Sequence, residues 1–154
     1  MSRLLLATLA TTVAFQPSAS RAARGRALAA TTTLQSLLET MKDYGPVRAI
    51  CILPGAGAIL EASSDASQWT LNESTTPTGK RLLTAAAPDK GFELHLDVDR
   101  VARATLGTSP KTGGPICRIM DAEGAGLLTL LPRKGSSFVA DVVGELGEEV
   151  TLSS

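Results

Sequence analysis

The stretch Phe92-Glu93-Leu94-His95-Leu96-Asp97-Val98 alternates apolar and polar residues over its full length. Because successive side chains of a β-strand point to opposite faces, this alternation predicts a strand with one buried and one polar face. His95, the only histidine of the chain, falls on the polar face between two carboxylates. The stretch therefore indicates a sheet that is covered on one side, with the imidazole pointing away from the main core.

Similar apolar segments lie before and after this strand, separated by turn sequences rich in Gly and Pro. We expect strands at residues 47–53, 58–62, 81–86, 116–120 and 127–131, with the first two and the last two each forming a hairpin. The polar segment 63–77 is typical of a loop with a short strand at 69–71. Residues 98–106 match a strand and a helical turn equally well, so their structure stays open at this point.

Two helices are expected near the ends of the domain. The first helix has one apolar face, formed by Leu34, Leu37, Leu38 and Met41, with Thr32 or Thr33 as N-cap and Gly45-Pro46 as the end. The second helix repeats this spacing with Val139, Val142, Val143 and Leu146, with Ser136 or Ser137 as cap and Gly147 as the end. Strands between two helices predict an α+β fold, an antiparallel sheet flanked by an N-terminal and a C-terminal helix. The edges of such a sheet must be covered, and a homodimer is one means of covering them.

Composition limits the kinds of partner. Removing the four arginines that precede Glu39, the first acidic residue, leaves 11 basic against 15 acidic side chains, with one Trp and one Tyr. This balance argues against nucleic-acid binding. Hydrophobic residues make up 44% of the chain, enough for one core, but no apolar run approaches the roughly 20 residues of a membrane-spanning helix.

The first 30 residues have the composition of a targeting leader. They contain no acidic side chain, an apolar stretch at 4–14, and then a segment rich in Ser, Ala and Arg. A signal-type stretch followed by a transit-type segment, joined at Ala14-Phe15-Gln16-Pro17, resembles the bipartite plastid leaders of algae with secondary plastids. We therefore expect residues 1–30 to be removed and residues 31–154 to form a single domain in the plastid stroma. A mitochondrial leader and a plain secretory signal are the alternatives.

The two cysteines, Cys51 and Cys117, both lie in apolar, strand-like runs. A small buried hydrophobic residue is usual at such positions, so we expect structural thiols, with a disulfide as the alternative. Two cysteines and one histidine are too few ligands for a closed Cys/His zinc site.

The order of several motifs resembles the bacterial haem-utilisation and haem-degradation proteins of the HemS/ChuX/HutX kind. The matching motifs are Tyr44-Gly45-Pro46-Val47, Ile59-Leu60-Glu61, Phe92-Glu93-Leu94-His95-Leu96, the apolar segment 101–106, Asp121-Ala122-Glu123-Gly124, and Arg133, which stands where the family has Gly-Arg-Asp. In the family, as in this chain, a helix follows these motifs and closes the domain. The resemblance covers residues 34–147, nearly the whole expected domain.

The resemblance implies an antiparallel-sheet fold, often dimeric, that binds haem with a histidine on the iron. His95 is the residue of this chain that can take that role, and Arg133 can pair with a haem propionate. With no second histidine, the sixth iron ligand must be water, Tyr44, a methionine or a residue of a partner subunit. The alternative for His95 is a solvated strand histidine, hydrogen-bonded beside Glu93 and Asp97.

Three functions follow as hypotheses. The first is binding and handling of haem, or of a related tetrapyrrole, in the plastid. The second is a structural or interaction domain that has lost the ligand and acts as an assembly factor. The third is haem breakdown, in which the cofactor itself would carry the oxygen chemistry and few protein residues would be diagnostic. Whether the protein is an enzyme therefore stays open.

Overall fold

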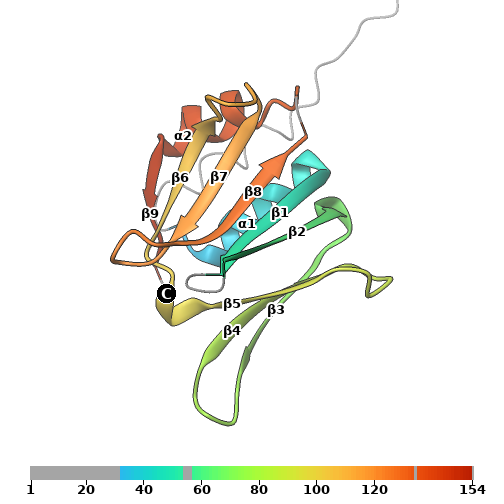
Figure 1. Ribbon diagram of the computed structural model, residues 1–154, viewed down its shortest axis with the longest axis vertical. Helices are drawn as coiled ribbons and strands as arrows, with labels where there is room; N and C mark the ends of the chain where they lie inside the picture. Colours follow the sequence, from blue (N-terminus) through green and yellow to red (C-terminus); the bar gives the residue numbers. More distant parts are fainter. Residues whose placement is uncertain (1–31, 54–56, 134, 154) are drawn as a thin grey trace, which may run out of the picture.

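The computed structural model describes residues 32–53, 57–133 and 135–153, which form two antiparallel sheets (Figure 1). The predicted leader, residues 1–30, and the first hairpin turn, residues 54–56, lie outside the described residues. The larger sheet has the strand order β2-β1-β8-β7-β6-β9, and the smaller one β3-β4-β5. The strands are β1 (Pro46–Leu53), β2 (Ala58–Asp65), β3 (Thr70–Thr75), β4 (Arg81–Ala86), β5 (Glu93–Asp97), β6 (Arg103–Thr108), β7 (Pro115–Met120), β8 (Gly126–Pro132) and β9 (Glu149–Thr151).

Helix α1 (Leu34–Met41) follows the expected apolar stripe and has Thr33 as its N-cap. The Thr33 side chain accepts a hydrogen bond from the Ser36 amide at 3.0 Å, and the Ser36 hydroxyl oxygen accepts one from the Thr33 amide at 2.9 Å. This reciprocal pair satisfies two of the amides that the first turn of a helix leaves without a partner. A 3-10 turn (Lys42–Tyr44) continues the helix to Gly45, where the chain enters β1.

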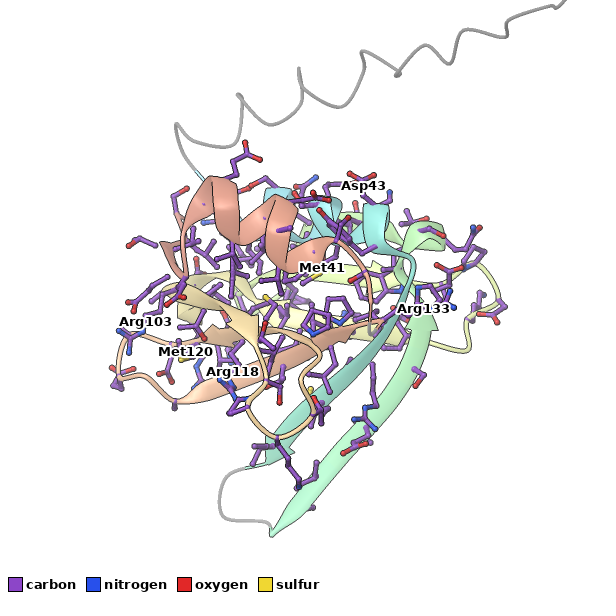
Figure 2. The ribbon with its side chains drawn as sticks, turned by 90° about the horizontal axis from the view of Figure 1, so that it is seen from above. Met41, Asp43, Arg103, Arg118, Met120 and Arg133 are labelled. Carbon is purple, nitrogen blue, oxygen red and sulfur yellow. The ribbon has the colours of Figure 1, made fainter. Side chains whose placement is uncertain are left out.

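Both predicted hairpins are present in the larger sheet. Strands β1 and β2 pair along their full length, from Pro46 opposite Asp65 to Leu53 opposite Ala58. Strand β2 is longer than expected and reaches into the polar segment that we interpreted as a loop. Seen from above, the free end of this hairpin projects beyond the rest of the molecule (Figure 2).

The smaller sheet contains β3, a strand of six residues where only three were expected. Five of its residues are exposed, so its side chains carry no apolar alternation that would have indicated a strand. Residues 98–106 combine both interpretations: a 3-10 turn (Val98–Arg100) precedes strand β6.

The C-terminal end differs most from expectation. The closing helix begins as a π-helical segment (Val139–Val143) and ends with a single α-turn, α2 (Gly144–Leu146). Its N-cap is Phe138, and no side chain of the described residues caps its start; the Ser137 hydroxyl, which was expected as a cap, donates to a carboxylate oxygen of Asp141. The chain then adds strand β9, which was not predicted and pairs with β6 at the edge of the larger sheet.

A single core joins both sheets and α1. Its largest fully buried side chains include Trp69, Phe138, Leu37, Leu38 and Leu83. Trp69 stacks on Phe92 with the ring centres 5.2 Å apart, and its indole N–H donates to the Ser64 hydroxyl at 2.9 Å. The α+β class with mostly antiparallel strands is thus confirmed, although the helices are short and two sheets replace the single one expected. In the described part of the chain, no helix is long and apolar enough to cross a membrane.

Both cysteines are free thiols, Cys117 fully buried and Cys51 partly so. Burial raises the pKa of the Cys117 thiol to about 12, and partial burial also raises the pKa of Cys51. The structural role expected of Cys117 therefore fits its position in the core.

Candidate functional site

A cavity of about 550 Å³ lies where β1 begins and β8 ends, and it is larger than a second cavity beside it. Its lining combines apolar and hydroxyl-bearing residues with two arginines, Arg48 and Arg133. The lining residues are Pro46, Val47, Arg48, Ser63, Ser64, Thr112, Gly114, Pro115, Leu131, Pro132 and Arg133. Pockets of this size that combine an apolar body with few polar groups are typical of small-molecule sites. No acidic side chain lines it within the described residues.

Strand pairing brings the two arginines to the same end of the sheet. Arg48 lies opposite Leu131 in the β1/β8 register, and the Arg133 amide donates to the Pro46 carbonyl at 3.1 Å immediately beyond the last paired residues. Arg48 also forms an ion pair with Glu61 at 3.6 Å, in which both side chains are about half exposed. Such exposed pairs contribute little to stability, so the Arg48 guanidinium stays available to a ligand.

A second cavity, of about 360 Å³, shares Arg133 with the first. Asp43, Tyr44, Gly135, Ser136 and Ser137 complete its lining. The Ser136 hydroxyl oxygen is buried and has no hydrogen-bond partner among the described residues. A buried hydroxyl without a partner is costly, which makes this position a candidate donor to a ligand oxygen.

Tyr44 is held in place in this second cavity by contacts with Phe138 and Asp141. Its ring packs edge-on against Phe138, with ring centres 5.2 Å apart and planes at 87°. Its hydroxyl donates to a carboxylate oxygen of Asp141 at 3.3 Å, and that same oxygen accepts from Ser137. Tyr44 therefore forms part of a packed wall of the cavity that Arg133 also lines.

His95 lies elsewhere, on the exposed face of β5 in the smaller sheet, and it lines neither cavity. Its Nδ1 is 2.8 Å from the Thr84 hydroxyl oxygen on β4, and its Nε2 is 3.4 Å from a carboxylate oxygen of Glu93. Both ring nitrogens thus have polar neighbours, which corresponds to the alternative of a hydrogen-bonded strand histidine. Within the described residues, no group of His, Cys, Asp and Glu side chains is arranged to hold a metal ion.

Of the three predicted site residues, the structure brings Tyr44 and Arg133 together and leaves His95 on the other sheet. Sequence reasoning missed Arg48, the second arginine of the larger cavity. The one available signal was its place two residues after Pro46 at the start of a strand, and this spacing alone gives no reason to choose it. Its role depends on the β1/β8 pairing.

Comparison with known proteins adds no relative, because neither a protein-family model nor a curated protein matches the chain. The resemblance to haem-utilisation proteins therefore stays a prediction. The function must be argued from the cavities themselves.

Proposed function

We propose that this protein binds a small molecule bearing carboxylates, and that a tetrapyrrole such as haem, with its two propionates, is the ligand class. The observation that carries the proposal is the 550 Å³ cavity lined by Arg48 and Arg133 and by no described carboxylate. A guanidinium presents a planar set of donors that matches a carboxylate in bidentate geometry. The predicted leader would place this binding protein in the plastid.

The rest of the lining suits an amphipathic ligand. Pro46, Pro115, Leu131 and Pro132 supply rigid apolar surface, while the hydroxyls of Ser63 and Thr112 add polar contacts. An apolar ring system can pack against the first group while its acidic substituents reach the arginines. The buried Ser136 hydroxyl in the adjoining cavity offers a further donor beside Arg133.

This proposal rests on carboxylate recognition and does not require His95 on an iron. Ligation of iron by this imidazole would need Nε2 to give up its contact with Glu93. It would also need the ligand to lie against the smaller sheet, away from both cavities. The geometry of the cavities thus supports the predicted contact between Arg133 and a haem propionate. It does not support the predicted contact between His95 and the iron.

The test is a titration of the full chain with haem and, separately, with iron-free protoporphyrin, followed by absorbance and fluorescence. We expect saturable binding of both ligands at about one per chain. Arg48→Gln and Arg133→Gln should each weaken binding by about 10-fold or more, because hydrogen bonds to charged groups contribute about 1.5–3 kcal/mol each. His95→Ala should leave protoporphyrin binding unchanged.

Arg100→Gln is the matched control, since Arg100 is an exposed arginine outside both cavities, 3.5 Å from Asp121. The Arg100→Gln variant should bind haem and protoporphyrin with the same affinity as the parent. Equal affinities for the parent and for both cavity variants would overturn the proposal. Binding of haem alone, abolished by His95→Ala and insensitive to the arginines, would instead favour iron ligation at the smaller sheet.

A second candidate function, an interaction domain without a ligand, is favoured by one observation. Ile52, Ile59 and Leu60, near the free end of the β1–β2 hairpin, have 58%, 64% and 64% of their surface exposed. Ile52 and Ile59 are directly paired across the hairpin, and exposed apolar side chains that adjoin in this way are a feature of protein contact sites. A protein that binds neither haem nor protoporphyrin would support this function over the first.

A further inference from the structure

The larger cavity borders one face of the larger sheet. Along β1, Val47 and Ala49 are buried in the core, whereas Arg48 lies on the opposite side, which we call the outer face. Arg48 lines the cavity, and so does Leu131, its direct partner across β1 and β8. Figure 2 shows Arg118 of β7 on the same side of the sheet, away from the helices. A ligand in the cavity can therefore extend along the outer face.

The strand register places six outer-face residues in two adjacent rows beside the cavity. The first row is the Arg48 and Leu131 pair, which Ile116 continues because it lies two positions before Arg118 on β7. The second row pairs Ile50 of β1 with Thr129 of β8, and Thr129 with Arg118. We call this group the outer-face patch: its members are Arg48, Leu131, Ile116, Ile50, Thr129 and Arg118.

The two arginines stand at opposite corners of the outer-face patch. Two strand spacings and a shift of two residues separate their Cα atoms, which is roughly 12 Å at about 4.8 Å per strand and about 3.4 Å per residue. Ile50 and Leu131 lie between them and are only partly buried, so apolar surface is accessible there. A flat apolar ring can lie over this surface while acidic groups on its opposite edges reach Arg48 and Arg118.

Arg118 has no counter-charge within the sheet. Its side chain is exposed, and its directly paired neighbours, Thr129 and Thr105, are neutral. Among the residues that the structure describes, no carboxylate forms an ion pair with it. In contrast, Arg103 of β6 on the same face is paired with Glu149 at 3.5 Å. The Arg118 guanidinium can thus bind a ligand carboxylate without first losing a partner.

We propose that Arg118 is a further ligand-binding residue, and that the ligand is a tetrapyrrole with carboxylates on opposite edges of its ring. Arg48 and Arg133 bind the acidic groups at the cavity, and Arg118 binds one at the opposite edge. This inference rests on the proposed function, because it places the same ligand and narrows its class. Protoporphyrin carries its two carboxylates on one edge, whereas coproporphyrin carries one propionate on each pyrrole ring.

The test compares the affinities of the full chain for coproporphyrin and for protoporphyrin by fluorescence titration. The parent should bind coproporphyrin about 10-fold more tightly or better, because the opposite carboxylate adds a charge-assisted contact. Arg118→Gln should weaken coproporphyrin binding by about 10-fold and leave protoporphyrin binding unchanged. Comparing the two ligands in each variant cancels any general effect of the substitution on the fold.

Arg103→Gln is the matched control, because Arg103 lies on the same face, one strand further from the cavity than Arg118. It should leave both affinities unchanged. Equal affinities of the parent for the two porphyrins would overturn this inference. So would an Arg118→Gln variant that binds coproporphyrin as tightly as the parent does, or one that loses affinity equally for both ligands.

The cavity variants separate a failure of this inference from a failure of the proposed function. If Arg48→Gln and Arg133→Gln weaken protoporphyrin binding while Arg118→Gln has no effect on coproporphyrin, the proposed function stands and Arg118 has no role in it. A parent that binds neither porphyrin would contradict both proposals.

Discussion

The thiol of Cys117 lies opposite Leu106 of β6 and Leu130 of β8, in the centre of the larger sheet. Its complete burial removes water from the site, and this desolvation raises its pKa to about 12. The folded protein thus holds the thiol in its neutral form.

The raised pKa of Cys117 predicts how stability depends on pH. In the unfolded chain the thiol loses its proton near pH 9, whereas the folded protein keeps it to about pH 12, so unfolding releases a proton in that window. The free energy of unfolding should therefore fall by about 1.4 kcal/mol per pH unit between pH 9 and 12, relative to Cys117→Ala. Urea titrations at several pH values measure this difference. The same slope in parent and variant would contradict it.

At the scale of single residues, sequence analysis located part of the candidate site. Arg133 and Tyr44 were selected from motifs, and the structure places both on one cavity. Arg48 could not be selected, because its proximity to Arg133 arises from the pairing of strands far apart in the sequence. The position of His95 on the polar face of its strand was predicted correctly from the alternation of apolar and polar residues. That alternation does not show which sheet the strand joins.

At the scale of elements, segments with strong periodicity were predictable and the polar or short ones were not. Apolar residues of helix α1, strand β1 and the β7–β8 hairpin are buried in the core. Strand β3 is held by backbone pairing to β4 while five of its six residues are exposed, so composition gave little indication of it. Strand β9 has three residues, which are too few to show a periodic pattern of apolar side chains. Its position is fixed by its pairing with β6.

The start of α1 gives a prediction at this scale. Thr33→Ala removes the hydroxyl that accepts from the Ser36 amide, and it should lower the free energy of unfolding by about 1 kcal/mol. Gln35→Ala, at an exposed position of the same first turn, should be neutral. Chemical denaturation of the three proteins measures the difference. Equal stability of all three would show that the cap contributes nothing.

At the scale of the whole molecule, the two ends of the described domain meet. Thr33 forms an isolated parallel bridge with Ser153, and the Ser153 amide donates to the Thr32 carbonyl at 3.0 Å. The sequence could not show that the strands form two sheets, because this division depends on which strands pair with one another.

The leader carries a separate prediction for the whole chain. Residues 1–30 fused to a fluorescent protein should direct it to the plastid stroma when expressed in an alga with secondary plastids. Replacing Phe15 with Ala, at the junction of the two leader parts, should retain the fusion outside the plastid. Import into mitochondria or secretion of the parent fusion would contradict the plastid assignment.

The central claim is that Arg48 and Arg133, the two arginines lining the larger cavity, recognise carboxylates. Its most direct test compares the affinity of the full chain for protoporphyrin with that for its dimethyl ester, which keeps the ring and removes both charges. We expect the ester to bind about 100-fold more weakly, and this difference to shrink in the Arg48→Gln, Arg133→Gln double variant. Equal affinities of the parent for the acid and the ester would contradict the account.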